Sequence, residues 1–504
     1  MQLLLAYQRE KTNPKTSLNP KKFIMKNGNQ IKRERMKTKI FIILMLISAN
    51  SFASEKNFVG CWIGKIDILR QVLSIKICLD VDSSKKLTGK IDIPQQNAYG
   101  LKLSNISCSK DSIWFDLIAN VMNVAKFSGR ISNPGTEKAF ISGSFWQMGM
   151  VGTFELEPFI EEQEDTLQSI PIHEEEVAIR NGEVQLAGTF TRLSEQKKYP
   201  LVIFISGSGK QDRDENIFGF KIFKMISDRL VRNGYATLRM DDRGTGGSTE
   251  IPGTSETIFD FASDIEAAIE FLKTRDDVDT TAIGLLGHSE GAIVAFVVAS
   301  KRQDIGFVIS MAGPTVRGDS LIVEQIRIQM LGQNAPDSLI QETLNQQREI
   351  YNIVRNNGDF ERAQQILLQQ AKKQLEFYPE EISSQISKTM IERNIQLQLE
   401  SMRSDWFRTF IDTDPLIYIE KVQCPILFLF GELDTQVPAK LNAERINHLR
   451  KKPGIKIKIV PKANHLFQKA RTGYTYEYPI LPKKFAQGFF ESIEMWMKSI
   501  MKQK

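Results

Sequence analysis

Histidine and cysteine are both scarce in this chain of 504 residues. Their small number and wide spacing argue against a zinc site, and four cysteines are too few for a disulfide scaffold. Three of the cysteines lie early, which predicts one early disulfide and one unpaired thiol in an exported protein. We expect no metal or other cofactor. The residues concerned are His173, His288, His448, His465, Cys61, Cys78, Cys108 and Cys424.

The N-terminal region lacks an apolar run long enough for a membrane-spanning helix, which needs about 20 residues. The uncharged run at residues 40–48 follows Lys37 and Lys39 and precedes Ser51-Phe52-Ala53. This order of basic, apolar and small residues is typical of a secretory signal peptide. We expect a signal peptide over residues 36–53, cleaved near Ala53, and export to the periplasm or the extracellular space without a stable membrane anchor. Residues 1–35 would then be an extension upstream of the true start.

An excess of basic charge is also missing from most of the chain. Residues 1–40 hold eleven Lys and Arg against two Glu, a net charge of +9, whereas the whole chain carries +6, so residues 41–504 carry −3. A nucleic-acid partner would require basic charge on the folded part. We therefore expect no nucleic-acid binding.

Residues 58–158 have the pattern of a small β-domain. A chain of this length with 41% hydrophobic residues is expected to form two or more folded units. Alternating apolar and polar residues at 73–79, 87–91 and 139–146, with turn residues between them, predict an antiparallel sheet closed into a sandwich or barrel. We interpret Trp62 and Trp146 as core residues, with carbohydrate binding as the alternative.

The pattern changes to that of an α/β domain over residues 175–504. Asn181-Gly182 lies between two alternating runs, which predicts a β-hairpin at the start. Apolar residues at 261–272 have helical spacing, and apolar strands alternate with such segments. This predicts a doubly wound parallel sheet covered by helices. The predicted strands are residues 201–205, 235–238, 282–286, 307–310, 426–430 and 455–459.

This alternation stops at about residues 315–420, where the sequence is polar, Gln-rich and helical. A loop of that length without secondary structure is implausible. In an α/β sheet such insertions lie at the carboxyl ends of the strands, where ligands bind. We therefore predict an inserted helical lid over a binding site.

The run Gly287-His288-Ser289-Glu290-Gly291 lies between a predicted strand and a predicted helix. A serine on such a sharp turn is exposed as a nucleophile, and flanking glycines allow close backbone approach. The helix N-terminus would also stabilise a developing oxyanion. Ser289 is therefore the predicted nucleophile, although a plain strand-to-helix turn with packing glycines produces the same pattern.

A serine nucleophile in this setting needs an acid and then a histidine, in that chain order. Only His465 fits, because it follows the last predicted strand. Asp434 and Glu432 both follow the strand at 426–430, and Asp434 is favoured because it lies further into the loop, ahead of Pro438.

The remaining histidines fit less well. His173 precedes the domain, His288 lies inside the turn, and His448 lies in a helical pattern where a solvated face is the favoured interpretation.

Two backbone N–H groups are expected to form the oxyanion hole. One belongs to Glu290, which follows the nucleophile. The other lies in the loop Ser206-Gly207-Ser208-Gly209, where we favour Ser208 and keep Gly209 as the alternative. This loop lacks the Gly-Lys-Ser/Thr ending of a phosphate-binding loop.

Six segments together resemble secreted bacterial α/β-hydrolases of the serine-aminopeptidase-like or prolyl-oligopeptidase-like group, whose studied members are commonly carboxylesterases. The resemblance implies an α/β-hydrolase fold with an inserted lid. It also implies that Asp242 and Arg243 are a structural pair that braces the loops, an interpretation we favour over a role in binding the substrate. Lys210, where Pro is expected, and Ala292, where Gly is common, depart from the pattern. The segments are residues 206–214, 240–246, 287–291, 406–408, 431–438 and 464–468.

The predicted function is hydrolysis of small or short-chain carboxylic esters through an acyl-enzyme. Trp406, Phe407 and Phe410 either wall the substrate pocket or pack the lid onto the domain, two interpretations that the sequence leaves open. Aminopeptidase or amidase activity is the alternative, and an inactive hydrolase-like binding protein is a third interpretation. The expected partner is a small-molecule ester, and the sequence does not predict an oligomeric state.

Overall fold

A computed structural model describes residues 56–68, 71–120, 123–147, 149–159, 171–194, 197–251, 256–376, 383 and 387–501. The predicted extension and signal peptide, residues 1–53, lie outside these residues. The chain divides into two compact units, residues 1–162 with 377–390, and residues 163–376 with 391–504. Within the described ranges, every helix is too short or too polar to cross a membrane.

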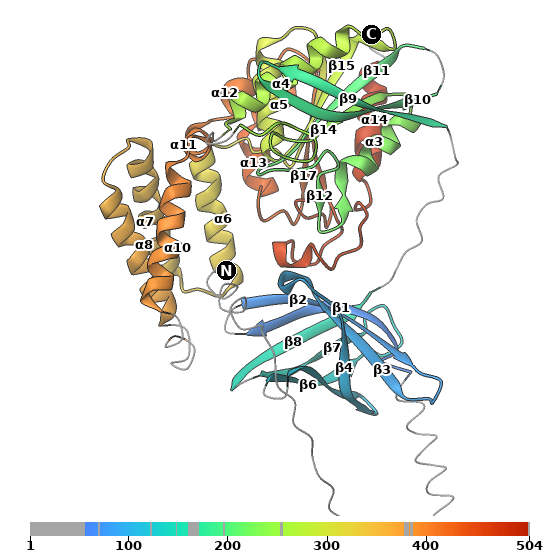
Figure 1. Ribbon diagram of the computed structural model, residues 1–504, viewed down its shortest axis with the longest axis vertical. Coiled ribbons are helices and arrows are strands. Elements are labelled where there is room, and N and C mark those ends of the chain that lie inside the picture. Colours follow the sequence, from blue (N-terminus) through green and yellow to red (C-terminus); the bar gives the residue numbers. More distant parts are fainter. Residues whose placement is uncertain are drawn as a thin grey trace, which may run out of the picture. The chain divides into compact units, whose positions relative to one another are not determined.

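The first unit contains a closed antiparallel barrel of eight strands, in which each strand pairs with the next and β1 pairs with β8 (Figure 1). Phe115, Phe127 and Phe154 meet inside it, with ring centroids 4.7 to 6.1 Å apart. The predicted all-β domain is therefore confirmed, as a barrel. Its strands are β1 (Gly60–Ile68), β2 (Gln71–Val81), β3 (Leu87–Ile93), β4 (Ala98–Ser109), β5 (Ser112–Asn120), β6 (Asn123–Ser132), β7 (Phe140–Gln147) and β8 (Met150–Pro158).

Strand alternation decides the environment of the two tryptophans in the barrel. Trp62 is buried and its Nε1 donates to the Phe58 carbonyl at 2.8 Å, so the core interpretation is correct for it. Trp146 is 44% exposed, and the core interpretation is wrong for it. Its neighbour Phe145 points inward, and successive side chains of a strand point to opposite faces.

One disulfide joins Cys61 on β1 to Cys78 on the adjacent strand β2, and the two residues pair directly across the strands. This agrees with the expected early disulfide.

The second unit is built on an eight-stranded sheet in the order β18-β17-β16-β15-β11-β14-β10-β9. The strands from β18 to β14 run parallel, and β10 and β9 are antiparallel at one edge. The six predicted strands all lie in the parallel part. The strands are β9 (Ile172–Asn181), β10 (Val184–Leu193), β11 (Tyr199–Ile205), β14 (Ala236–Met240), β15 (Val278–His288), β16 (Ile305–Met311), β17 (Ile426–Gly431) and β18 (Ile455–Val460).

The hairpin predicted at Asn181-Gly182 is confirmed, since Asn181 pairs with Val184 across the turn between β9 and β10. A second, very short hairpin of β12 (Asn216–Ile217) and β13 (Phe220–Lys221) was not predicted.

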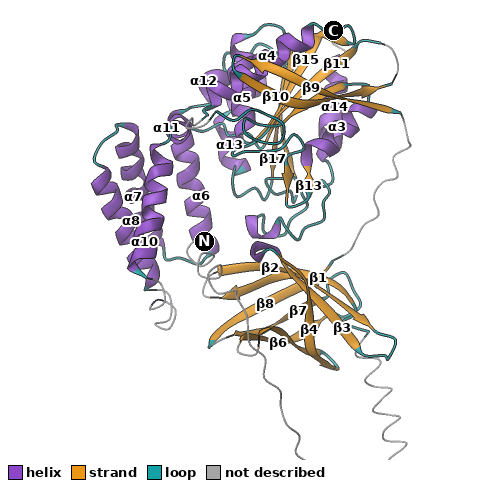
Figure 2. Ribbon diagram, viewed as in Figure 1, coloured by secondary structure: helices purple, strands orange, loops and turns teal. Residues whose placement is uncertain are grey.

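Helices cover both faces of this sheet (Figure 2). On one face, α3 (Ile222–Arg232) and α14 (Phe489–Met501) pack on apolar side chains that alternate along the strands. On the other face lie α4 (Ile258–Lys273) and α5 (Glu290–Lys301). Thr257 caps α4: its side chain accepts from the Phe259 N–H, and Asp260 accepts from the Thr257 N–H. The doubly wound architecture is thus confirmed.

A helical insertion separates β16 from β17, as predicted (Figure 1). After its last, short helix the chain returns to the sheet at β17. Helix α13 (Ala439–Arg445) follows that strand. The insertion comprises α6 (Gly318–Gly332), α7 (Asp337–Arg355), α8 (Phe360–Leu375), α10 (Lys388–Arg403), α11 (Asp405–Asp412) and α12 (Leu416–Ile419).

Candidate active site

Ser289 lies in the turn between β15 and α5 with φ 53° and ψ −120°. A residue other than glycine in this region of backbone space is strained by about 1–3 kcal/mol. The Ser289 N–H donates to the Met311 carbonyl at 2.8 Å, which holds the turn at the end of β16.

Close backbone contacts explain the two glycines of the turn. A Cβ on Gly287 would lie 2.3 Å from the Gly291 carbonyl oxygen, and a Cβ on Gly291 would lie 2.1 Å from the Ile205 carbonyl oxygen. Only glycine fits at these positions without displacing the backbone.

The loops after β17 and β18 bring Asp434 and His465 together. His465 Nδ1 lies 2.8 Å from Asp434 Oδ2, and both side chains are buried. Asp434 Oδ1 accepts from the Gln436 and Val437 N–H groups, each at 2.8 Å, so the carboxylate cannot turn away. With Nδ1–H donating to Asp434, His465 Nε2 carries a lone pair that is able to accept a proton.

Glu432, the other acid weighed from the sequence, is exposed and accepts from the Lys462 N–H at 2.7 Å. It therefore braces the loop that leads to His465. His448 is exposed and lies 3.3 Å from Glu420, and His173 is exposed on β9.

The loop after β11 packs directly against Ser289. A Cβ built on Gly207 would lie 3.3 Å from the Ser289 Cβ. The Gly207 N–H donates to Glu215 Oε1 at 2.9 Å, so this group is already occupied. Ser208 and Gly209 follow Gly207 in the loop, and Glu290 begins α5, where the first N–H groups of a helix have no partner within the helix.

Asp242 closes the base of this loop. It accepts from the Ser206 Oγ at 2.5 Å and from the Gln211 N–H at 2.9 Å, so it holds both ends together. Burial raises the pKa of Asp242 to about 7. Arg243 instead contacts Asp264, at 2.7 and 2.8 Å. Asp242 and Arg243 therefore both brace loops, as the resemblance implied, and each does so through its own partners.

A buried network that we did not predict lies beside the Ser289 turn. His288 Nδ1 lies 2.8 Å from Glu215 Oε1, and His288 Nε2 lies 3.1 Å from the His465 carbonyl oxygen. Both side chains are almost fully buried. His288 had only been excluded as the catalytic base, and no pattern in the sequence singles out Glu215, because its contact with His288 spans 73 residues.

The lid reaches the site through α11. Trp406 Nε1 donates to Glu290 Oε1 at 2.8 Å, and the Trp406 ring stacks on Phe410 with centroids 5.6 Å apart. Burial raises the pKa of Glu290, partly offset by hydrogen bonds from Ser208 and Trp406. Phe407 lies 6.0 Å from Tyr351 of the lid itself.

The contacts of Trp406 therefore differ from those of Phe407 and Phe410. Trp406 bridges the lid to the residue after Ser289, whereas Phe407 and the buried Phe410 pack within the lid region.

The other end of the site contacts α6. Gln325 Nε2 donates to the Gln436 carbonyl at 2.8 Å, two residues after Asp434, and Tyr474 donates to the Ile328 carbonyl at 3.1 Å. Both α6 and α11 therefore contact the carboxyl edge of the sheet. Helix α6 contacts the loops after β17 and β18, and α11 contacts the first residue of α5.

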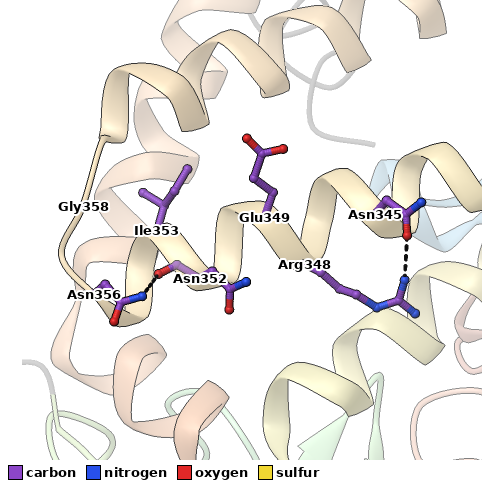
Figure 3. Close-up of a pocket in the computed structure, with 7 residues that line it drawn as sticks. All are labelled: Asn345, Arg348, Glu349, Asn352, Ile353, Asn356 and Gly358. Atoms are coloured by element: carbon purple, nitrogen blue, oxygen red, sulfur yellow. Dashed lines mark hydrogen bonds between the residues drawn. The ribbon is translucent and has the colours of Figure 1, made fainter.

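Of the hollows in the described part of this unit, one lies away from the Ser289 turn and another lies beside it. The first, drawn in Figure 3, is an open groove along α7 that is lined mostly by polar side chains, together with Ile353 and Gly358. The other is a small cavity of about 40 Å³ behind the loop after β11, lined by residues that include Asp242, Asp264 and Glu290.

The sheet, the helices on its two faces and the loops at its carboxyl edge together form an α/β-hydrolase fold. Residues 220–469, just under half of the chain, match the family model described as serine aminopeptidase, S33. The match supports the group of S33-type and esterase α/β-hydrolases to which the sequence motifs pointed.

Among curated proteins, the chain is similar to the esterase EstD of Thermotoga maritima, with 24% identity over 327 residues. The aligned part is 65% of this chain and 66% of EstD, slightly less than two thirds of that protein.

Two solved structures also align with this chain. The esterase Pf2001 of Pyrococcus furiosus aligns with a TM-score of 0.38 and 17% identity, over 66% of this chain and 91% of that one. The α/β-hydrolase GrgF of a Penicillium species aligns with a TM-score of 0.39 and 15% identity, over 66% of this chain and 98% of that one.

Proposed function

We propose that this protein is a serine hydrolase that cleaves carboxylic esters with small or short acyl groups through an acyl-enzyme. The observation that carries the proposal is the strained backbone of Ser289 in the turn between β15 and α5. Strain of this kind persists where the surrounding structure enforces it, and it clusters at active sites. The similarity to the esterase EstD supports an ester as the substrate.

In the proposed reaction, His465 Nε2 takes the Ser289 Oγ proton while Oγ attacks the ester carbonyl. Asp434 holds the His465 tautomer and stabilises the imidazolium that forms. The Glu290 N–H, with the Ser208 or Gly209 N–H, stabilises the oxyanion. His465 then donates its proton to the leaving alcohol, and water releases the acid by the same steps.

Replacement of Ser289 tests this proposal. We expect Ser289→Ala to lose hydrolysis of p-nitrophenyl butyrate and covalent labelling by a fluorophosphonate, with an unchanged circular dichroism spectrum. Ser401→Ala, an exposed serine of α10, is the matched control and should keep both. Activity that persists in Ser289→Ala would contradict the assignment of the nucleophile.

Aminopeptidase or amidase activity is the second candidate, and the description of the matching family as serine aminopeptidase favours it. Comparison of kcat/KM for p-nitrophenyl esters and aminoacyl p-nitroanilides separates the two. Faster anilide hydrolysis would reverse the order of the candidates. No turnover of either class, and no fluorophosphonate labelling, would favour an inactive binding protein.

We further propose that the protein is exported after cleavage near Ala53. The Cys61–Cys78 disulfide supports export, since disulfides persist in oxidising compartments. Mass spectrometry of the protein from a secreting host should find an N-terminus close to residue 54. An N-terminus upstream of Met36 would contradict this.

A further inference from the structure

We propose that His288, as a charged imidazolium paired with Glu215, is a positioning residue that ties the base His465 to the oxyanion loop at Gly207. This inference rests on the proposed function, because it assigns the role of His288 relative to that catalytic histidine. It concerns residues that do not touch the substrate themselves.

The charge that we assign to His288 rests on the two partners of its ring nitrogens. One nitrogen faces a carboxylate oxygen at 2.8 Å, and the other faces a backbone carbonyl oxygen at 3.1 Å. A neutral imidazole has only one N–H donor, and a carbonyl oxygen can only accept. The form that we assign, an imidazolium, donates to both oxygens at the same time, and Glu215 Oε1 accepts from the ring as it does from the Gly207 N–H.

Glu215 extends the link to the opposite side of the site. Its Oε1 accepts both from His288 and from the Gly207 N–H, at 2.8 and 2.9 Å. Gly207 in turn packs against Ser289. A continuous chain of three hydrogen bonds therefore runs from the Gly207 backbone through Glu215 and His288 to the His465 backbone.

This chain joins two loops that follow distant strands of the sheet. Gly207 follows β11, His465 follows β18, and these strands are separated by β15, β16 and β17 in the sheet. Productive attack requires the base and the oxyanion donors to be fixed relative to Ser289, and a displacement of about 1 Å can cost about 100-fold in rate.

The surroundings of His288 explain how its charge is retained. Burial alone lowers the pKa of His288, but the Glu215 carboxylate outweighs it, together with the His465 carbonyl and the Asp434 charge, so that the pKa is raised. The His465 ring lies 4.9 Å from the His288 ring.

Glu215→Gln is the decisive variant. Glu215 Oε1 holds both hydrogen bonds, while Oε2 is buried without a partner among the described residues. A Gln amide oxygen can replace Oε1, and its NH2 group can take the place of Oε2, so the variant removes the charge and leaves both hydrogen bonds possible. His288→Gln is the second variant and breaks at least one link.

We expect Glu215→Gln to lower the pKa of His288, so that a decline in kcat on the alkaline side appears at a lower pH than in the wild type. At pH 8 we expect kcat for p-nitrophenyl butyrate to fall about 10-fold, and to fall about 10- to 100-fold in His288→Gln, with KM within about twofold in both. Titration with a fluorophosphonate measures the concentration of active sites, so that kcat is expressed per active site. His448→Gln, an exposed histidine paired with Glu420, is the control and should match the wild type.

Three outcomes overturn the inference. The first is a wild-type kcat and pH profile in both variants, and the second is a loss in Glu215→Gln that does not depend on pH. The third is a change in thermal stability alone, with unchanged kcat per titrated site. These results differ from failure of the proposed function, in which the wild type is inactive or Ser289→Ala keeps its activity.

Discussion

At the scale of single residues, the Asp434 side chain shows how backbone contacts fix the orientation of a carboxylate beside a histidine. Its Oδ1 accepts two backbone N–H groups, and its Oδ2 faces His465 Nδ1. The two oxygens therefore cannot exchange roles. Any group that replaces Oδ2 decides which nitrogen of His465 carries the proton.

We therefore expect Asp434→Asn to lose about 10³- to 10⁴-fold in kcat. The Asn carbonyl would keep the place of Oδ1 beside the two N–H groups, and its NH2 would donate to Nδ1. His465 would then carry its proton on Nε2 and could not accept one from Ser289. Steady-state kinetics measure the loss, and Asp276→Asn, at an exposed carboxylate before β15, serves as control. A loss below about tenfold would contradict this account.

The residue scale also shows what sequence reasoning missed. Ser289, Asp434 and His465 were predicted from their order and their positions at strand ends. Glu215, in contrast, contacts His288 and Gly207 only because the loop of residues 212–215 folds back beneath the turn. Asp242 and Arg243 were expected to brace the loops as a structural pair, but the partner of each residue was not predicted.

At the scale of elements, α11 couples the lid to the helix that follows Ser289. Ser404 caps α11 by accepting from the Phe407 N–H, and Trp406 in its first turn reaches Glu290. This indole hydrogen bond links the insertion to the loop after β11, because Glu290 also accepts a hydrogen bond from Ser208.

We expect Trp406→Phe to raise KM about tenfold with a smaller effect on kcat. Phenylalanine retains an aromatic ring beside Phe410 but loses the donor to Glu290, and removal of the partner of a buried polar group costs about 1–3 kcal/mol. Steady-state kinetics with p-nitrophenyl butyrate measure the changes in KM and in kcat separately. Trp114→Phe, an exposed tryptophan of the barrel, is the control. A fall in kcat at constant KM would contradict a role in holding the lid.

Strands and helices were easier to predict than the lid contacts. Parallel strands buried on both faces are continuous apolar runs, as in Ile426–Gly431, so their positions are visible in one sequence. The short hairpin of β12 and β13 has two residues in each strand and leaves no periodic signal.

At the scale of the whole molecule, the disulfide belongs to the barrel unit alone. We expect the double variant Cys61→Ala/Cys78→Ala to lower the free energy of unfolding of the barrel by about 3 kcal/mol, because the bond closes a loop with a sequence separation of 17 residues. Esterase activity should be unaffected, since the proposed catalytic residues lie in the other unit.

Differential scanning calorimetry of the full chain, with and without reductant, measures the effect on the barrel. Cys424→Ala, in the hydrolase unit, is the control. Equal melting profiles for the double variant and the wild type would contradict the stabilising role of the disulfide.

The sequence by itself determined the fold class, the small all-β domain that precedes the α/β-hydrolase unit, and the candidates Ser289, Asp434 and His465, whereas the structure decided that the β-domain is a barrel. Burial pattern, turn residues and chain order are local properties, so they can be recognised without coordinates. Only the tertiary structure decided that Trp146 faces outward, that Asp242 and Arg243 have separate partners, and that His288 lies between Glu215 and His465. These contacts join residues far apart in the chain, and their hydrogen bonds depend on how distant loops pack at one edge of the sheet.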